Sequence, residues 1–347
     1  MNSKMKVAVM TDLKKIDFIE RDIPNPKNDE VLVKLEYVGV CGSDLHYYEH
    51  GSIGKYIVKP PFVLGHECSG TVVEIGDKVK HLKVGDKVAL EPGKTCGECE
   101  FCRSGKYNLC PDIIFFATPP VDGVFQEYVT HPEHLSFKLP DNLTTMEGSL
   151  IEPLSVGMHA AMQGEAKLGQ TAFVTGTGCI GLCSMLSLKA CGISKVYVID
   201  IIKKRLDKAL ELGASGVIDA SKEDVVKRVY ELTNGKGSDL TIETSGAESV
   251  TNQAIEFAKK GSTMVLVGYS KTGMMNINLG LALDKELTFK TVFRYRHIFP
   301  LSIEAVSSGA INIKNIVSNI YEFNDLQNAL DNSLNDKENI VKTVIKI

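Results

Sequence analysis

The stretch from Thr171 to Asp200 most constrains what this chain can fold into. An apolar, β-rich run at 171–175 leads into Gly176-Thr177-Gly178-Cys179-Ile180-Gly181, and an apolar helical stretch follows. A second β-rich run at 195–199 ends at Asp200. This order of strand, glycine turn, helix and strand is typical of a dinucleotide-binding βαβ unit.

Each part of this pattern has a role in nucleotide binding. Gly176 permits a tight turn, Gly178 lets the backbone approach a pyrophosphate, and Gly181 lets the helix pack closely on the strand. The helix N-terminus offers free N–H groups and a positive dipole end to the phosphates. At the end of the second strand, the Asp200 carboxylate can accept hydrogen bonds from the adenosine ribose hydroxyls.

Two simpler interpretations compete with nucleotide binding. A lone G-x-G-x-x-G is often an ordinary turn, but here both strands, the helix and the terminal acid occur in the required order. The uncharged run at 172–188 also resembles a membrane span. Its glycines cluster at a strand-to-helix turn, and Lys189 interrupts it before the ~20 apolar residues that a span needs.

Length and composition indicate a two-domain globular protein. The chain has 347 residues, is 44% hydrophobic and 24% charged, and carries a formal net charge of -4. This mild acidity gives no reason to expect nucleic acid or an anionic membrane as a partner. The N-terminal segment lacks the apolar region of a secretory signal, so we expect a cytoplasmic protein. Nine cysteines, an odd number, favour metal ligation and buried thiols over a disulfide framework.

The order of predicted elements indicates an α/β protein. Residues 1 to about 90 are β-rich, and strands alternate with helices from about 155 to 290, which predicts a parallel sheet. The last stretch of the chain is too short for an independent domain, so we expect it to fold back onto the first part. The predicted strands are 31–35, 70–75, 171–175, 195–199, 216–219, 240–244 and 264–268, and the predicted helices are 205–212, 222–232 and 250–259.

A cluster of four cysteines forms a second strong signal. Cys96, Cys99, Cys102 and Cys110 lie in a segment rich in Gly, Pro, Glu and Lys, which cannot form a core of its own. Thiolates at this spacing can surround one tetrahedral zinc ion, and a site closed by four sulfurs leaves no position for a substrate. We therefore expect a structural zinc that braces a loop. Redox-active or merely buried cysteines are the alternative, and a disulfide is disfavoured in the cytosol.

A third signal is dispersed along the chain. Cys41, the pair His66-Glu67, and Glu152 are each weak alone, because Gly-His-Glu is commonly a loop and a Glu before a Pro can cap a helix. Together they offer a thiolate, an imidazole and carboxylates. Such a set can hold a catalytic zinc through three protein ligands and leave one position open for water or a substrate oxygen.

These motifs carry a resemblance to a known family. The pattern Gly65-His66-Glu67-x-x-Gly70, with Gly76 and Val79 after it, resembles the signature of the zinc-containing medium-chain alcohol dehydrogenases, and the resemblance covers essentially the whole chain. Within that family, the stretches at 41–67, 149–160 and 292–300 are similar to the sorbitol (polyol) dehydrogenases. Ordinary alcohol dehydrogenases carry cysteine where this chain has Glu152. All four lobe cysteines are present, as in microbial polyol dehydrogenases and unlike some animal sorbitol dehydrogenases.

The resemblance implies a domain organisation and an activity. It implies a GroES-like β-rich catalytic domain of residues 1–155 and 291–347, and a Rossmann domain with a doubly wound parallel sheet at 156–290. It further implies zinc and NAD(P) as cofactors, oxidation of a polyol to a ketose, and the homotetramer that is common in the family.

The resemblance also assigns residues of the active site. Cys41, His66 and Glu67 would approach the catalytic zinc, and Glu152 would be either a direct ligand or a group that reaches the metal through water. A proton relay would use Ser43 and His46, for which a turn hydroxyl and a surface histidine are the simpler interpretations. The residues expected to line the polyol pocket, besides Glu152, are Tyr47, Phe115, Arg294 and Tyr295, and Phe115 could equally be plain core.

The choice of cofactor depends on Asp200, whose carboxylate repels a 2′-phosphate and so favours NAD over NADP. The neighbouring Lys203 and Lys204 weaken this argument, because a basic pair could tolerate a phosphate, and Arg205 could lie over the adenine. The other residues that the resemblance places along the dinucleotide are Ile180, Val267, Gly268, Tyr269, Val292, Phe293 and Arg294.

Two other functions remain open at this stage. The first is another secondary-alcohol dehydrogenase of the same fold, acting on a butanediol, threonine or a sugar-alcohol phosphate. The run His46-Tyr47-Tyr48 and the segment 294–296 favour a polyol instead. The second is a non-catalytic nucleotide-binding protein, but every expected ligand and relay residue is present. The sequence does not rank individual polyols.

Overall fold

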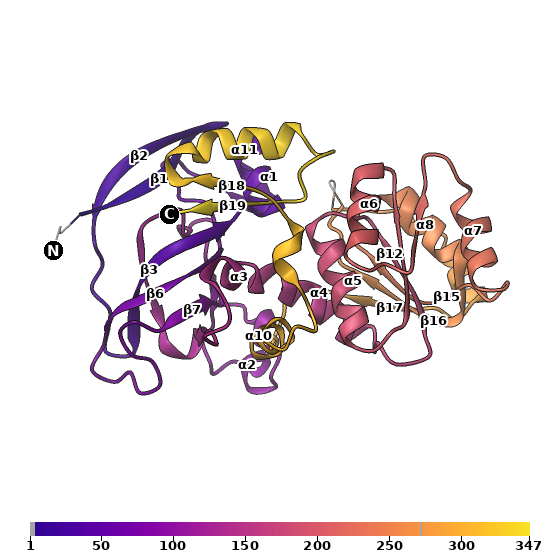
Figure 1. Cartoon of the computed structure of the whole chain (residues 1–347), viewed down its shortest axis with the longest axis horizontal. Helices are drawn as coiled ribbons and strands as arrows, with labels where there is room; N and C mark the ends of the chain where they lie inside the picture. The colour runs from indigo at the N-terminus through magenta and orange to yellow at the C-terminus, as the bar shows by residue number, and fades with distance from the viewer. Residues whose placement is uncertain (1–3, 271–272) are drawn as a thin grey trace. The chain divides into compact units, whose positions relative to one another are not determined.

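The structure is a computed structural model that describes residues 4–270 and 273–347 (Figure 1). It divides into two compact units. The first runs from the N-terminus to Glu152 and includes Phe299–Ser308 and Val317–Ile347, and the second consists of Pro153–Ile298 and Gly309–Ile316. The α/β fold class predicted from the sequence is confirmed by the sheets of these two units.

The first unit is built around a seven-stranded sheet with the order β11-β7-β6-β3-β19-β18, in which β10 also pairs with β3. Most of its pairs are antiparallel, whereas β18 and β19 run parallel. The central strand β3 is buried at most positions, because side chains on both of its faces are covered. The C-terminal strand β19 pairs with β3, Val344 lying opposite Gly39, so the end of the chain completes the sheet that the beginning starts.

The elements of the first unit have the following bounds: β1 Lys4–Asp12, β2 Lys15–Asp22, β3 Glu30–Gly39, α1 Gly42–His50, β4 Ser52–Ile53, β5 Tyr56–Ile57, β6 Glu67–Ile75, β7 Lys87–Leu90, β8 Gly93–Lys94, α2 Glu100–Arg103, η1 Tyr107–Leu109, β9 Ile114–Phe115, β10 Tyr128–Pro132, η2 Glu133–Leu135, β11 Ser136–Lys138, α3 Thr145–Ser149, α10 Phe299–Ser307, β18 Val317–Glu322, η4 Phe323–Asp325, α11 Leu326–Asn335 and β19 Lys342–Lys346. The helix α4, Ile151–Gln163, begins at the end of this unit and continues into the second.

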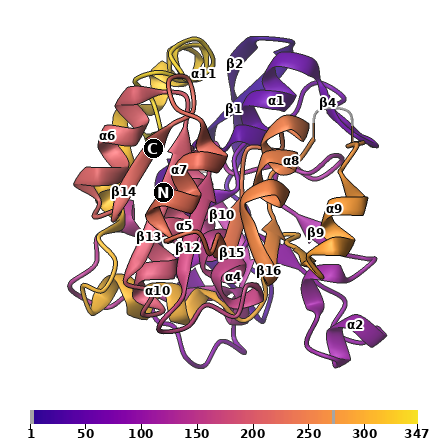
Figure 2. The same cartoon turned by 90° about the vertical axis from the view of Figure 1, so that its right-hand side faces the viewer.

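The second unit contains a six-stranded sheet with the order β14-β13-β12-β15-β16-β17, and the pairs are parallel. Figure 2 shows β14, β13, β12, β15 and β16 following one another across this unit. The order places the first strand, β12, at the centre, with the chain winding outward in both directions. Residues 172–175 of β12 are all buried, as expected for a strand covered on both faces.

The elements of the second unit have the following bounds: β12 Thr171–Thr175, α5 Cys179–Ala190, β13 Lys195–Asp200, α6 Lys203–Glu211, β14 Gly216–Asp219, α7 Val225–Leu232, β15 Ser238–Glu243, α8 Glu248–Phe257, β16 Ala258–Leu266, α9 Leu279–Asp284, β17 Thr288–Thr291 and η3 Ile313–Ile316. A helix predicted to start at Lys222 starts at Val225, because the Asp224 side chain caps it by accepting from the amide of Lys227. The helix predicted to reach Lys259 ends at Phe257, where β16 follows directly.

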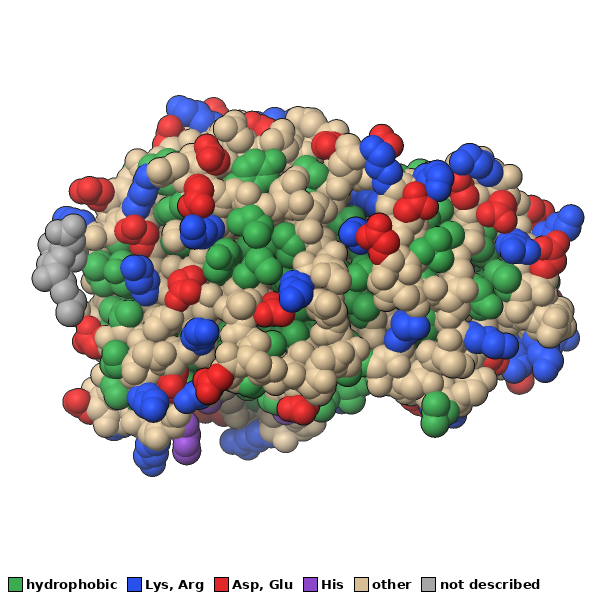
Figure 3. Space-filling view, viewed as in Figure 1, with side chains coloured by type: hydrophobic (Ala, Val, Ile, Leu, Met, Phe, Trp, Pro, Cys, Tyr) green, Lys and Arg blue, Asp and Glu red, His purple; other side chains and the backbone are tan. Residues whose placement is uncertain are grey.

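The surface agrees with the mild net charge. On the face that Figure 3 shows, basic and acidic side chains are interspersed and do not form the continuous basic stripe that tracks a nucleic-acid backbone. Among the residues that the structure describes, no helix has both the length and the apolar character to cross a bilayer.

A buried ion pair joins the last strand to the strand that carries the Gly-His-Glu motif. Lys342 on β19 donates its Nζ to Glu67 Oε2 and to the carbonyl oxygen of Val40, the latter at 2.9 Å. The side chains of Lys342 and Glu67 are 1% and 2% exposed, so neither charge has water to solvate it. Each charge therefore depends on the other for compensation.

Replacing Lys342 tests this dependence. We expect Lys342→Met to lower the free energy of unfolding of the metal-free protein by about 3–5 kcal/mol, because Glu67 is left as a buried, unpaired charge. The control is Lys346→Met on the same strand, whose pair with Glu322 at 3.3 Å is exposed and should contribute about 0–1 kcal/mol. Chemical denaturation of both variants after chelator treatment gives the comparison, and equal losses would contradict the assignment.

Candidate active site and metal centres

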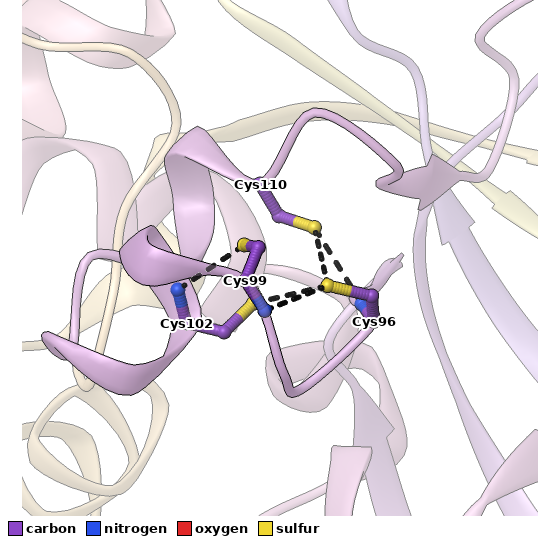
Figure 4. Close-up of side chains that lie close together, drawn as sticks. All are labelled: Cys96, Cys99, Cys102 and Cys110. Atoms are coloured by element: carbon purple, nitrogen blue, oxygen red, sulfur yellow. Dashed lines mark hydrogen bonds between the residues drawn. The ribbon is translucent and has the colours of Figure 1, made fainter.

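Four cysteine side chains converge in the loop between β8 and β9 (Figure 4). The sulfur atoms of Cys96, Cys99, Cys102 and Cys110 all lie within 4.8 Å of one another. Cys96 Sγ is 3.5 Å from Cys110 Sγ and 3.9 Å from Cys102 Sγ. A tetrahedral zinc ion with Zn–S bonds of about 2.3 Å requires sulfurs about 3.8 Å apart. The four thiols therefore fit one zinc ion with no position left for a substrate.

The local backbone orients these sulfurs. The amide of Cys99 donates to Cys96 Sγ at 3.4 Å, and the amide of Cys102 donates to Cys99 Sγ at 3.4 Å as α2 begins. Hydrogen bonds from the amides of Glu98 and Cys99 lower the pKa of Cys96 to about 7, whereas burial raises the pKa of Cys110 to about 12. Backbone donors thus stabilise negative charge at this cluster before any metal binds.

A second group of possible ligands forms around the start of β6. Cys41 directly precedes α1, His66 directly precedes β6, and Glu67 is the first residue of β6. The ligand atoms of these three residues lie within 4.8 Å of one another, and His66 and Glu67 are buried. A thiolate, an imidazole and a carboxylate are a donor set that zinc binds, and three protein ligands leave a fourth position open.

Asp44 holds this group together. Its fully buried carboxylate accepts from the amide of Cys41 at 3.0 Å and from the amide of Gly65 at 2.9 Å, and it lies 3.7 Å from His66 Nδ1. Burial disfavours the charged imidazole, but the negative charges of Cys41 and Asp44 outweigh it and raise the pKa of His66 well above its ordinary value. Asp44 therefore fixes the backbone before both ligands and orients the histidine ring.

The two candidate carboxylates are placed differently. Glu67 belongs to the group of ligand atoms within 4.8 Å, and one of its oxygens also receives Lys342. Glu152, at the start of α4, is buried but lies outside that group. Burial is the largest cause that raises the pKa of the Cys68 thiol, and the negative charges of Glu152 and Glu67 raise it further. Both carboxylates therefore lie near Cys68. The role of Glu152, as a direct ligand or as a group that reaches the metal through water, stays a prediction.

The helix α1 presents several of the expected relay and pocket residues. His46 and Tyr47 follow Ser43 by three and four positions, so both lie on the same side of the helix as Ser43. Ser43 and His46 are half-buried, whereas Tyr47 is buried. From β9, the ring of Phe115 lies 5.8 Å from the ring of His66, centroid to centroid. The His66 ring therefore has an apolar aromatic neighbour that contributes no charge.

Arg294 and Tyr295 belong to the second unit. Arg294 has a φ of 56°, and its guanidinium lies 4.8 Å from the centre of the Phe293 ring. Tyr295 is buried, while Phe293 is half-exposed. The positive φ is an uncommon conformation for arginine, and it marks this segment as one that its surroundings hold in shape.

The glycine fingerprint forms the predicted turn between β12 and α5. Gly176 has a φ of 88°, and a Cβ added at Gly181 would lie 1.9 Å from the carbonyl oxygen of Gly176. At Gly178, by contrast, an added Cβ would meet nothing within 4 Å. Close packing therefore requires Gly181, whereas Gly178 leaves open space at the N-terminus of α5. That space suits a pyrophosphate group.

Asp200 ends β13 beside this turn, and its carboxylate already has partners. One oxygen accepts from the amide and hydroxyl of Thr177 at 2.6 and 2.5 Å, and the other accepts from the amides of Ile201 and Ile202 at 2.7 and 2.9 Å. A carboxylate has about four lone-pair sites. Ribose hydroxyls would therefore have to share or replace the Thr177 hydroxyl.

The remaining residues expected along a dinucleotide lie in the second unit. Burial lowers the pKa of the Arg205 guanidinium, and the neighbouring Asp200 partly offsets this effect. Ile180 is half-buried in the first turn of α5. The residues beyond the carboxyl ends of β16 and β17 are Val267, Gly268, the exposed Tyr269, Val292, Phe293 and Arg294.

Comparison with known protein families identifies the fold of both units. Residues 27–141 match the family described as alcohol dehydrogenase GroES-like domain, and residues 179–308 match the zinc-binding dehydrogenase family. The chain belongs to the zinc-containing medium-chain alcohol dehydrogenases. The resemblance drawn from the Gly-His-Glu signature and the glycine fingerprint is thereby confirmed.

Full-length relatives place the chain near the polyol enzymes of this family. It is 44% identical to a zinc-type alcohol dehydrogenase-like protein of Escherichia coli (strain K12), over 100% of this chain and 99% of that protein. It is 39% identical to a sorbitol dehydrogenase of Bacillus subtilis (strain 168), over 98% and 97% of the two chains. It is also 43% identical to a sorbitol dehydrogenase of Bos taurus, over 90% and 88%.

Solved structures of related dehydrogenases superpose over nearly the whole chain. An Escherichia coli oxidoreductase of unknown specificity has a TM-score of 0.95 and 43% identity, with 99% of each chain covered. An Escherichia coli alcohol dehydrogenase in complex with NADH has a TM-score of 0.92 and 29% identity, with 100% of each covered. A 2R,3R-butanediol dehydrogenase from Bacillus subtilis has a TM-score of 0.90 and 34% identity, with 99% of each covered.

Sequence reasoning missed two residues that the structure connects to the metal ligands. Asp44 could have been found, because an acid three residues after Cys41 at a helix start has the spacing of a capping box. Lys342 carries no such signal, since 275 positions separate it from Glu67.

The four-cysteine cluster predicts a specific loss of metal. We expect Cys110→Ser to reduce the zinc content by about one ion per chain, because a hydroxyl is a poor substitute for the fourth thiolate. The matched control is Cys191→Ser, which lies outside both ligand groups and should keep the full content. Elemental analysis of the purified variants decides, and unchanged zinc in Cys110→Ser would contradict a four-sulfur site.

The two later glycines of the fingerprint should separate stability from nucleotide binding. We expect Gly181→Ala to destabilise the protein by about 1–3 kcal/mol, because its Cβ collides with the backbone of Gly176. Gly178→Ala should keep the wild-type melting temperature but bind NADH more weakly, because its methyl group enters the open space before α5. Thermal unfolding and NADH titration test both, and a Gly178→Ala variant with wild-type affinity would refute the phosphate site.

Proposed function

We propose that this protein oxidises a secondary hydroxyl of a sugar alcohol, such as sorbitol or xylitol, to the ketose, with transfer of a hydride to NAD. The observation that carries the proposal is the group of Cys41 with the buried His66 and Glu67, in a chain of which 98% aligns with a sorbitol dehydrogenase. The reaction balances when the CHOH carbon loses a hydride to NAD⁺ and its oxygen loses a proton to solvent.

The cofactors supply the chemistry, and the protein supplies geometry and charge. A bound zinc ion provides Lewis acidity toward the substrate hydroxyl, and bound NAD provides the hydride acceptor. Cys41, His66 and Glu67 would hold the zinc, with Glu152 either ligating directly or acting through water. Cys96, Cys99, Cys102 and Cys110 would hold the structural zinc.

The other residues act on the proton and on the substrate. Ser43 and His46, on the same side of α1, are proposed to pass the proton to solvent. Arg294, Tyr295 and Tyr47 offer the donors that a chain of hydroxyls needs, and Phe115 offers an apolar wall. Glu152 would also contact the substrate.

Binding of NAD rather than NADP is proposed from Asp200, because its negative charge opposes a 2′-phosphate. Arg205, Ile180 and the segments 267–269 and 292–294 complete the proposed cofactor site. We further propose a catalytic domain of residues 1–155 and 291–347 and a Rossmann domain of residues 156–290. A homotetrameric assembly and a cytoplasmic location remain predictions.

A second candidate is a dehydrogenase of the same family that acts on a smaller secondary alcohol. The observation that favours it is the similarity to the butanediol dehydrogenase structure, at 34% identity over 99% of both chains. Threonine and polyol phosphates belong to the same group of alternatives.

Substrate panels distinguish these candidates. We expect the zinc-loaded protein to form NADH from sorbitol, xylitol, ribitol or galactitol with NAD, and to do so much more slowly with NADP. Turnover restricted to 2,3-butanediol or threonine would reject the polyol assignment and the pocket residues with it. Absence of turnover together with half the expected zinc would point to a catalytic site that does not hold metal.

A neighbouring pair of histidines provides the control for the relay. The rings of His46 and His50 are 4.7 Å apart, centroid to centroid, but His50 is the exposed member at the end of α1. We expect His46→Gln to lower kcat by about 10²-fold or more and His50→Gln to retain it.

A further inference from the structure

The second unit contains a buried carboxylate for which the proposed chemistry has no role. Glu243 is the last residue of β15, and its side chain is 1% exposed. Burying a carboxylate is costly unless hydrogen bonds replace the water that it loses. Here the donors are neutral amides and hydroxyls of nearby residues. The Glu243 carboxylate therefore holds neighbouring backbone in place.

The Glu243 carboxylate organises the loop that directly follows β15. Its Oε1 accepts from the amide of Ser245 at 2.7 Å, from the amide of Gly246 at 3.1 Å and from the Ser245 hydroxyl. Its Oε2 accepts from the Gly246 amide at 3.2 Å, and Oε1 also lies 3.4 Å from the hydroxyl of Thr175, at the end of β12. One side chain thus fixes residues 244–246 against the central strand.

The backbone of the same residue organises a second loop. The carbonyl oxygen of Glu243 accepts from the amides of Val267 and Gly268, at 2.8 and 3.0 Å, where the chain leaves β16. The two loops then pack backbone against backbone. A Cβ added at Gly268 would lie 2.1 Å from the amide nitrogen of Gly246 and 2.9 Å from Glu243 Oε2.

The strand order indicates what these loops face. In a doubly wound sheet a dinucleotide lies across the carboxyl ends of the strands, with one nucleotide on each side of the central strand. The fingerprint turn after β12 and Asp200 at the end of β13 belong to the adenosine half. The loops after β15 and β16 lie on the other side of β12, which is the half left for nicotinamide.

We propose that Glu243 is a positioning residue that holds the loops 244–246 and 267–269 in the shape that binds the nicotinamide half of NAD. This inference rests on the proposed NAD-dependent function and adds to it a residue that belongs neither to the metal-ligand groups nor to the fingerprint turn. The role requires a carboxylate, because the Ser245 amide and hydroxyl donate to Oε1 and the Gly246 amide is shared between both oxygens. A glutamine of the same size would place its NH₂ group, a donor, at one of the two oxygen positions, where it would face another donor.

The test compares two ligands that share the adenosine half. NADH contains nicotinamide, whereas ADP-ribose ends at the second ribose. We expect Glu243→Gln to weaken NADH binding about tenfold, as loss of a hydrogen bond to a charged group does, and to leave ADP-ribose affinity within about twofold. Isothermal titration of the full-length, zinc-loaded protein measures both affinities, and elemental analysis confirms unchanged zinc.

The matched control lies on the same strand. Asp239, near the opposite end of β15, bonds the amide of Thr171 at 2.9 Å and the ammonium of Lys259. Asp239→Asn should keep both affinities, since it is remote from the carboxyl end of the sheet.

The outcomes separate this inference from the proposed function. If the wild type binds neither NADH nor ADP-ribose, the proposed function falls and this inference with it. If the wild type binds both and Glu243→Gln also binds both normally, only the inference is overturned. A parallel loss of both ligands in Glu243→Gln would likewise overturn it, because it would reveal a general distortion of the unit. Selective loss of NADH supports it.

Discussion

The compensation of buried charge is the constraint on which the first unit depends. Glu67 stands in the metal-ligand group and is almost completely shielded from water, as is its partner Lys342. Because the lysine comes from the last strand, the carboxylate is neutralised only when β19 has completed the sheet beside β3. Compensation of the Glu67 charge in the proposed catalytic group therefore requires that β19 pairs with β3. This requirement links the end of the chain to its beginning.

The same physical demand recurs at the other polar centres. Asp44 accepts from two backbone amides beside His66, and Asp200 accepts from Thr177 of the fingerprint turn and from the two amides that follow β13. Glu243 accepts from the amides of the loop after β15. In each case a carboxylate accepts hydrogen bonds from backbone amides that a turn would otherwise leave without an acceptor. The loops that surround the proposed ligands are consequently held by charge-assisted hydrogen bonds as well as by apolar packing.

Sequence reasoning reached the elements whose signals are local. The strand, turn and helix around Gly176 follow from residues adjacent in sequence, and the four cysteines between β8 and β9 meet because short spacings bring them together. Errors fell at the ends of helices and strands, and the strand predicted at 264–268 spans Ala258–Leu266. Asp224 delays the start of α7 by capping it, and β16 begins where α8 was expected to continue.

The sequence by itself determined the fold class and the family through the order of elements and motifs along the chain. It determined the four-sulfur cluster and the glycine turn through spacing within one short stretch each. Only the tertiary structure decided which distant side chains share a site. It grouped Cys41 with His66 and Glu67, left Glu152 outside that group, and brought in Lys342 from the far end of the chain. It also showed that the Asp200 carboxylate already accepts hydrogen bonds from the amide and hydroxyl of Thr177. The reason is that strand pairing and register set these distances, and neither is encoded in the spacing of the residues concerned.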